Sequence, residues 1–327
     1  MTTSLDVTVD VHLDADDLDA GLRTDVLDGL TREQKELPPK WLYDEAGSEL
    51  FDEITRLDEY YPTEAEREIL ERHASTIVER ARAHTIVELG AGTSDKTRAL
   101  LDAGRDRGTL RRFIPFDVSE EFLRTTAATL AESYRGIEVH GVVGDFDRHL
   151  GRIPLGGGRR MVVLLGGTIG NYPTAARATF LRGIAAGMSP GDRFLLGTDL
   201  VKDPARLVLA YDDPRGVTAA FNKNVLQVLN REVGADFDPD AFEHEATWNP
   251  HEEWIDLGLR SLLDQRVRID ELDLAVEFAA GEYLRTEVSA KFRLPSLAEE
   301  LAAVGLEVEL WFTDSAGDYG VSLSVLR

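Results

Sequence analysis

Three acidic residues follow or end short apolar segments, in the pattern of a nucleotide-binding sheet. Glu88 lies in "TIVELGAG", Asp117 ends "RRFIPFD", and Asp145 follows "VHGVVG". Carboxylates accept hydrogen bonds from ribose hydroxyls and from exocyclic amines. The carboxyl ends of parallel strands meet at one edge of a sheet, where ligands bind. We therefore expect the three acids to face one nucleoside-containing ligand.

The turn after the first of these segments distinguishes between ligands. It carries Gly90 and Gly92, but Asp95 stands where a dinucleotide fingerprint has its third glycine. A carboxylate there would repel a pyrophosphate. The turn therefore favours S-adenosylmethionine, which is cationic at sulfur and has a single carboxylate for the loop amides and Lys96 to bind.

The other parts of this ligand can be assigned to the acids and to one aromatic residue. Glu88 orients the loop and the ligand amine, and Asp117 accepts both ribose hydroxyls. In "GDF", Asp145 takes the adenine amine and Phe146 packs on the ring. Taken singly, Glu88 could be a turn acid, Asp117 a helix cap and Asp145 a loop residue. Together they predict a class I methyltransferase, with an NAD-dependent dehydrogenase as the enzymatic alternative.

Strand and helix patterns alternate over residues 85–200 and supply the elements that hold these residues. "DKTRALLDAGR" follows the first strand, and "SEEFLRTTAATLAESY" follows the second. The alternation predicts an α/β fold, a Rossmann-like doubly wound sheet, which the segment 306–326 closes as an antiparallel hairpin. Thr63 and Glu66 have the spacing of a capping box after Pro62.

The remaining segments predict an inserted second α+β domain. Residues 1–64 form an N-terminal helical segment that joins the core and carries substrate residues, and residues 80–199 form the cofactor-binding core. Residues 200–286 change from helix to strand patterns and predict the substrate domain, on which we expect residues 65–79 to pack. Residues 287–327 return to the core as strands.

The composition limits the partners. The chain has 327 residues, with 36 Lys and Arg against 60 Asp and Glu, and a formal net charge of −24. This charge repels phosphate backbones and anionic lipid, so we expect a small-molecule substrate and neither nucleic acid nor membrane. We expect a cytoplasmic protein, because no signal peptide and no apolar run of membrane length is evident. We expect a monomer, because no exposed apolar stripe is evident.

Some chemistry is excluded by residue type. The chain has no cysteine, which excludes disulfides, thiolate metal sites and cysteine nucleophiles. Seven histidines are present, but "HEAT" at 244–247 lacks the second histidine of a zinc helix. We expect no metal and no covalent intermediate.

Eight segments carry a resemblance to a known family. They are "LPPKWLYDEAGSELFDEITRLDEYYPTEAE", "VELGAGTSDKT", "FIPFDVS", "GDF", "GGTIGNY", "LLGTDLVKD", "AYDDPRGVTAAFNKNVL" and "RTEVSAKF". They resemble the actinobacterial L-histidine Nα-methyltransferases of ergothioneine biosynthesis, from about residue 16 to the C-terminus. The resemblance implies that three S-adenosylmethionines convert L-histidine to trimethylhistidine (hercynine), leaving S-adenosylhomocysteine.

The resemblance also implies which residues contact each ligand. Five positions match the family's cofactor site: Gly90, Lys96, Asp117, Asp145 and Phe146. Three match the positions that bind the substrate's amino and carboxylate groups: Tyr60, Asn171 and Tyr211. One position departs, because Leu257 in "IDL" stands where the family has methionine. The two side chains have similar volume, so we expect a small effect.

The imidazole is assigned by the same resemblance to Glu287 and Ser289, with Tyr43 nearby. "EVSAKF" has strand character, so Glu287 and Ser289 share one face. An ionised Glu287 would accept from an imidazole N–H and favour the charged ring. From the residues alone, a solvated strand face that Lys291 completes is the alternative.

Asn171 and Tyr60 are the predicted catalytic residues. Asn171 follows the fourth strand of the core in "LLGGTIGNY", where its amide could bind an amine and a carboxylate; alternatively, it only shapes a turn.

The tyrosines of "EYYP" and "AYDD" offer aromatic faces to a growing trimethylammonium, or pack at an interface. Methyl transfer is an in-line displacement that depends on positioning. Tyr60 or a water relays protons between rounds.

Two other functions stay open. One is an Nα-methyltransferase for another amino acid such as tryptophan or tyrosine, against which the pair Glu287 and Ser289 argues. The other is a non-catalytic S-adenosylmethionine-binding module, against which the complete cofactor set and Asn171 argue.

Overall fold

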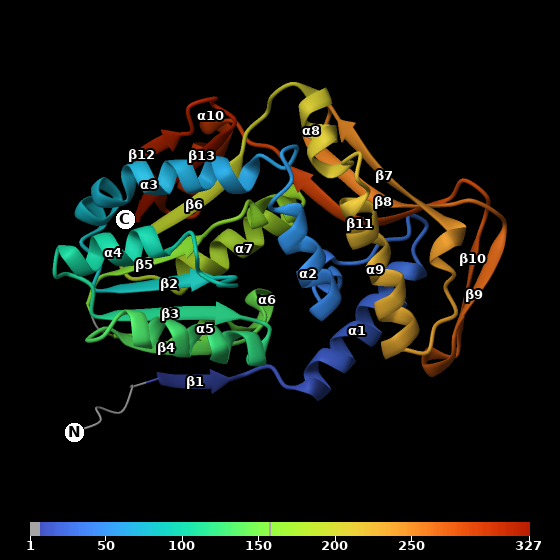
Figure 1. The fold of residues 1–327 in the computed structure, drawn as a ribbon, viewed down its shortest axis with the longest axis horizontal. Helices are drawn as coiled ribbons and strands as arrows, with labels where there is room; N and C mark the ends of the chain where they lie inside the picture. The colour runs from blue at the N-terminus through green and yellow to red at the C-terminus, as the bar shows by residue number, and fades with distance from the viewer. Residues whose placement is uncertain (1–6, 157) are drawn as a thin grey trace. The chain divides into compact units, whose positions relative to one another are not determined.

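The computed structural model describes residues 7–156 and 158–327, and these residues form two compact units (Figure 1). The first unit contains the described residues up to Asp14, Pro62–Leu200 and Phe292–Arg327. The second unit contains Ala15–Tyr61 and Val201–Lys291. The chain thus passes from the first unit to the second and back twice.

An eight-stranded sheet forms the centre of the first unit. Its order is β1 (Val7–Val11), β4 (Glu138–Val143), β3 (Arg112–Asp117), β2 (Thr85–Leu89), β5 (Arg160–Leu164), β6 (Arg193–Asp199), β13 (Tyr319–Leu326) and β12 (Leu306–Thr313). Strands β1 to β6 are parallel, and β13 pairs antiparallel with both β6 and β12. This arrangement confirms the predicted α/β fold and its closing hairpin.

The direction of winding places the ligand edge of this sheet. From β2 the chain builds outward through β3 and β4, and it then returns to the other side of β2 to add β5 and β6. Ligands bind beyond the carboxyl ends of the strands at such a switch point. Every residue of β2 and β5 is buried, as expected for central parallel strands.

Helix α3 (Pro62–Ala81) belongs to the first unit, so the expectation that residues 65–79 pack on the inserted domain is wrong. Ile69 and Ile77 are fully buried, in a core that includes Ile86 of β2 and Phe113 of β3. Apolar periodicity identified the helix but carries no information on which sheet it covers. The other helices of this unit are α4 (Arg98–Asp106), α5 (Glu120–Ser133), α6 (Phe146–His149), α7 (Thr174–Ala186) and α10 (Leu294–Ala302).

The second unit combines N-terminal helices with the inserted segment. Its helices are α1 (Ala15–Leu30), α2 (Glu45–Ile54), α8 (Pro204–Tyr211) and α9 (Val217–Glu232). Its sheets are β11-β8-β7 (Tyr283–Ala290, Trp254–Ser261, Phe242–Asn249) and β10-β9 (Leu274–Phe278, Gln265–Ile269). All of β11 lies here, so residues 287–291 do not return to the core as expected. The reason is that β11 pairs with β8 along its whole length.

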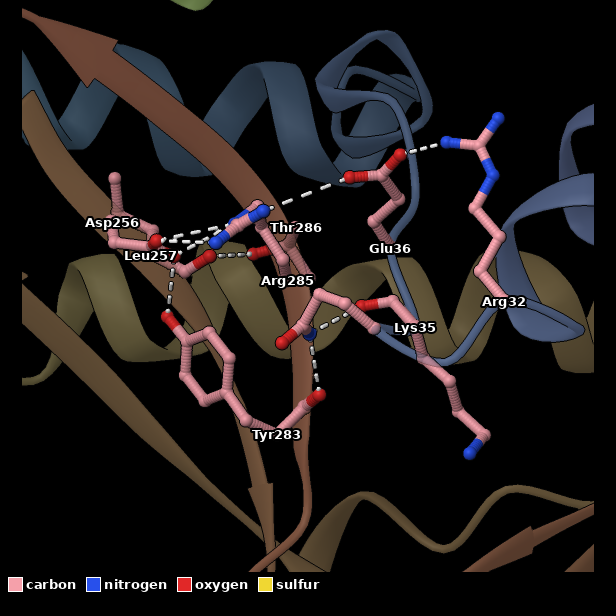
Figure 2. Close-up of polar contacts among 9 residues, drawn as sticks. Arg32, Lys35, Glu36, Asp256, Leu257, Tyr283, Arg285 and Thr286 are labelled. Atoms are coloured by element: carbon pink, nitrogen blue, oxygen red, sulfur yellow. Dashed lines mark hydrogen bonds and ion pairs between the residues drawn. The ribbon is translucent and has the colours of Figure 1, made fainter. Parts of the chain in front are cut away.

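An ionic network fixes the start of β11 (Figure 2). Asp256 of β8 accepts hydrogen bonds from the Tyr283 hydroxyl at 3.1 Å and from Arg285 Nη2 at 2.8 Å. Glu36 lies on the other side of the Arg285 guanidinium, 3.8 Å from Nη1. The register of the β11-β8 pair shifts between Arg285 and Glu287. The network therefore holds the backbone where this shift changes the pairing of the two strands.

Candidate functional site

Glu88 is the penultimate residue of the buried strand β2 and organises the loop that follows it. Its side chain accepts hydrogen bonds from Ser94 Oγ at 2.7 Å and from Thr97 Oγ1. Glu88 is only 4% exposed, and this burial raises its pKa to about 7, against the opposing effect of the two hydroxyls. The contacts that the structure gives Glu88 are therefore those of a loop-positioning residue.

The glycines of the loop have left-handed backbone conformations, with φ of +71° at Gly90 and +48° at Gly92. A Cβ at Gly90 would lie 3.3 Å from Cζ of Phe146, so glycine lets the aromatic ring lie against the loop. The Gly92 amide donates to Asp117 Oδ2 at 3.0 Å. These contacts bring four of the predicted cofactor residues together at the carboxyl edge of the sheet.

Asp117 and Asp145 both accept hydrogen bonds from backbone amides. Such bonds agree with their alternative roles as a helix cap and a loop acid. Asp117 Oδ1 accepts from the Ser119 amide at 3.2 Å, and burial raises the Asp117 pKa. Asp145 caps α6, because its Oδ1 accepts from the Asp147 amide at 2.8 Å. Such contacts fix the direction of each carboxylate, and one carboxylate oxygen accepts more than one hydrogen bond.

Lys96 forms an ion pair with Glu66 of α3, a partner that the sequence did not predict. The Glu66 side chain is completely buried and also accepts from the Gly166 amide at 2.9 Å and the Tyr319 hydroxyl at 2.9 Å. The proposed capping box is wrong, because α3 already begins at Pro62 and Glu66 points to the sheet. A signal was present, since Glu66 is an acid on a helix face that also carries Ile69.

Asn171 lies in the short 3-10 helix Thr168–Asn171 that follows β5, as the sequence predicted. Gly166 and Gly167 have φ of +78° and +72° and make the turn between strand and helix. The side chain of Asn171 is half-buried. This position matches the predicted switch-point edge of the sheet.

In the second unit, the predicted substrate residues Tyr211 and Ser289 form a buried polar cluster with Lys291. The Tyr211 hydroxyl and Ser289 Oγ are 2.8 Å apart, and Lys291 Nζ donates to both oxygens at 2.8 Å. Ser289 is 5% exposed and Lys291 is 4% exposed. The alternative of a solvated strand face is therefore wrong, because β11 is covered where these residues lie.

Glu287 and Leu257 are cross-strand neighbours. They face each other in the antiparallel pair of β11 and β8, and Leu257 is 3% exposed. Burial raises the pKa of Glu287 to about 7, against the opposing charge of Lys291. Near neutral pH, Glu287 can therefore either accept or donate a proton.

An aromatic cluster accompanies these polar groups. The Tyr60 ring lies 6.0 Å from that of Tyr211 and 6.2 Å from that of Phe51. Tyr43 packs edge-on at 5.3 Å from Phe51 and 5.2 Å from Phe221. Phe51 and Phe221 were not predicted, because an aromatic residue in an amphipathic helix pattern looks the same whether it lines a core or a site.

A hydrogen-bonded chain behind the cluster connects three elements. Thr286 Oγ1 donates to Asn222 Oδ1 at 2.5 Å, and Asn222 Nδ2 lies 2.9 Å from His244 Nδ1. His244 Nε2 lies 2.9 Å from the carbonyl oxygen of Tyr211. Burial lowers the pKa of His244, so the neutral ring donates through Nε2 and accepts at Nδ1. The chain therefore fixes the end of α8 relative to β11.

A metal-binding group and a membrane-spanning helix are both absent from the described residues. They contain no group of three or more His, Asp or Glu side chains arranged to hold a metal ion. Among the same residues, no helix is both long and apolar enough to cross a membrane.

Comparison with known proteins identifies the family. Residues 22–326 match the family described as histidine-specific methyltransferase, SAM-dependent. The chain is 57% identical to the Mycobacterium tuberculosis histidine N-alpha-methyltransferase and 58% identical to that of Mycolicibacterium smegmatis, covering 97% and 96% of this chain and 99% and 98% of the relatives. It is 32% identical to ergothioneine biosynthesis protein 1 of Neurospora crassa, over 72% of this chain and 29% of that protein. The chain therefore belongs to the family of histidine-specific, S-adenosylmethionine-dependent methyltransferases.

Proposed function

We propose that the protein transfers three methyl groups from S-adenosylmethionine to the α-amino group of L-histidine and releases hercynine. The observation that carries the proposal is the pair of half-buried Glu287 and buried Ser289, two residues apart on β11. An acid whose pKa is about 7 beside a serine hydroxyl suits the two nitrogens of an imidazole. The high identity to two histidine N-alpha-methyltransferases supports the same substrate.

The place of the reaction in metabolism is part of the proposal. A relative named ergothioneine biosynthesis protein 1 supports a role in that biosynthesis, and we propose that the reaction is its first step. We place the reaction in the cytoplasm and expect a monomer that acts on a small molecule. The net charge of −24 supports the exclusion of nucleic acid and anionic membrane as partners.

For the cofactor, we propose that the first unit holds S-adenosylmethionine at the carboxyl edge of its sheet. Asp117 takes the ribose hydroxyls, Asp145 the adenine amine, and Phe146 packs on the adenine. The loop amides at Gly90 and Gly92, with Glu88 and Lys96, hold the methionine part. The convergence of the loop glycines with Phe146 and Asp117 supports this assignment.

For the substrate, we propose that Asn171, Tyr60 and Tyr211 bind the amino and carboxylate groups. Leu257 lines the pocket beside Glu287, and Tyr43 supplies an aromatic wall. Aromatic faces accept a trimethylammonium, which has no N–H left to donate. The contacts among Tyr43, Tyr60 and Tyr211 and their neighbours support this wall.

Catalysis requires a neutral amine aimed at the methyl group, so a proton must leave before each transfer. We propose that Tyr60 relays it. Tyr60→Phe should lower the rate of methylation by roughly 10²-fold, the usual size of a proton-transfer contribution, with a smaller change in histidine affinity. Single-turnover assays measure the rate, and titration of histidine measures the affinity. An unchanged rate of all three methylations would contradict the relay.

The substrate assignment is tested by product mass. Purified protein and S-adenosylmethionine are incubated separately with histidine, tryptophan and tyrosine, and each mixture is analysed by mass spectrometry. Three added methyl groups on histidine alone are the expected result. Methylation of another amino acid instead would retain the cofactor site but contradict the assignment of Glu287 and Ser289.

A further inference from the structure

Lys291 has no part in the function proposed above, although its environment is unusual for a lysine. Among the residues that the structure describes, no other lysine side chain is classed as buried. Moving an ammonium group out of water is costly unless hydrogen bonds and favourable charges replace the lost hydration. A buried lysine next to a predicted substrate site therefore calls for a functional explanation.

Contacts with Tyr211 and Ser289 help to hold the ammonium group in place. It donates to the Tyr211 hydroxyl and to Ser289 Oγ, each at 2.8 Å, and it lies 4.4 Å from the centroid of the Tyr211 ring. Tyr211 and Ser289 are themselves 8% and 5% exposed. The Tyr211 and Ser289 hydroxyls both accept hydrogen bonds from the ammonium group.

The side chain of Lys291 folds back along β11. Its ammonium therefore lies beside Ser289, the residue two positions earlier in the strand. Glu287 is two positions earlier again, about 7 Å along an extended strand. One face of the strand thus presents a positive group and an acidic group, separated by about the length of a small amino acid.

We propose that Lys291 is a positioning residue that recognises the α-carboxylate of the amino-acid substrate by acting through the Tyr211 hydroxyl. A phenol oxygen that accepts from an ammonium becomes a stronger hydrogen-bond donor, so its O–H binds a carboxylate more tightly. Glu287 marks the opposite, imidazole end. The inference rests on the proposed histidine substrate and on the proposed contact of Tyr211 with it, and it adds Lys291 as the residue that strengthens the hydrogen bond to the carboxylate.

Histidine and histamine distinguish this role from a purely structural one, because they share the ring and the amine but differ in the carboxylate. The dissociation constants of both are measured by calorimetry with S-adenosylhomocysteine present, so that no turnover is needed. Lys291→Met should weaken histidine binding by roughly 10- to 100-fold, the range of one lost charge-assisted hydrogen bond. Histamine binding should change by less than about 3-fold.

A matched control is Lys35→Met in the same unit. Lys35 also lies over an aromatic ring, 5.1 Å from the centroid of Phe278, and it pairs with Glu282. This variant should bind histidine as the unchanged protein does. Lys291→Arg, which keeps the charge, should retain most of the preference for histidine over histamine.

Each result decides the inference. Equal losses for histidine and histamine in Lys291→Met, or no loss for either, would overturn the role of the carboxylate. If Lys291→Met does not fold, Lys291→Gln takes its place and is judged by the same ratio. Failure of the unchanged protein to bind or methylate histidine would instead refute the proposed function, which keeps the two failures distinct.

Discussion

At the scale of single residues, the protein keeps acids in places that disfavour their charge. Glu88 and Glu287 each have a pKa of about 7, and in both the main cause is burial. Perturbed acids of this kind concentrate at functional sites. Glu88 is bonded by neighbouring loop hydroxyls, whereas Glu287 is half-buried and faces Leu257 across the strand pair. Glu287 is therefore the one suited to contact the substrate.

Glu287 should make the protein less stable as the pH rises. Its folded pKa of about 7 exceeds the ordinary value of 4.5, so folding favours the protonated form. The penalty is small below pH 4.5 and grows until the pH passes 7. Glu287→Gln should therefore raise the free energy of unfolding by about 1–3 kcal/mol at pH 8, and by less at pH 5.

Urea unfolding at pH 5 and pH 8 measures this difference, and histidine titration measures what it costs in function. The variant should be more stable and should bind histidine more weakly, because a residue that binds a ligand can be kept at a cost in stability. A variant that is less stable than the original protein at pH 8 would contradict the assignment of a half-buried, ionised Glu287.

At the scale of elements, buried polar chains connect segments that are far apart in sequence. Glu66 of α3 bonds Lys96 of the loop after β2, Gly166 after β5 and Tyr319 of β13. Through these contacts one carboxylate fixes a cation and a backbone amide at the ligand edge of the sheet. Sequence periodicity placed the helix and the strands, but only tertiary packing brings these residues together.

Glu66 should act on the cofactor through Lys96. Glu66→Gln and Lys96→Met should each weaken S-adenosylmethionine binding by roughly 10-fold, because each breaks a charge-assisted contact. In the double variant the loss should be no larger than in Lys96→Met alone. Calorimetry measures the dissociation constants, and Tyr319→Phe, which removes only a hydroxyl from Glu66, is the control. Additive losses would show that Glu66 and Lys96 act independently.

Asn222 of α9 has the corresponding role in the second unit. It bonds Thr286 of β11, the Gly258 carbonyl of β8 and His244 of β7. Asn222→Ala leaves buried partners unsatisfied, so it should cost about 2–4 kcal/mol of unfolding free energy and also weaken histidine binding.

Asn230 of the same helix is the matched control for this prediction. Its side chain bonds both the amide and the carbonyl of Phe237. Asn230→Ala should lower stability in urea unfolding without changing histidine affinity. If both variants lose affinity equally, the chain from Thr286 to Tyr211 has no special role in positioning the site.

At the scale of the whole molecule, the sequence predicted the order of elements better than their grouping. Strand–helix alternation is a local pattern, and it identified the parallel sheet and the closing hairpin. The membership of α3 and β11 depends on contacts between distant residues, such as Ile69 with the sheet core and β11 with β8. These contacts leave no periodic signal in the sequence, so residues 65–79 and 287–291 were assigned to the wrong unit.

In the candidate site, too, local patterns were predicted well and contacts between distant residues were not. Acids and glycines at strand ends predicted the cofactor loop, because turn chemistry is local. Family resemblance was needed for Tyr60, Tyr211, Glu287 and Ser289, which come from distant segments of the chain. The role of Glu66 was missed, although its helix face also carries Ile69. The hydrogen-bonded chain of Asn222 was not predicted, since nothing in a single sequence shows which distant residues a buried polar side chain contacts.

The central claim is that each histidine receives three methyl groups. The most direct measurement supplies a limiting, known amount of histidine with excess S-adenosylmethionine and follows S-adenosylhomocysteine to completion. Three S-adenosylhomocysteines per histidine, with hercynine as the final product, is the predicted result. A ratio that stops at one or two, or S-adenosylhomocysteine formation that does not depend on histidine, would contradict the account.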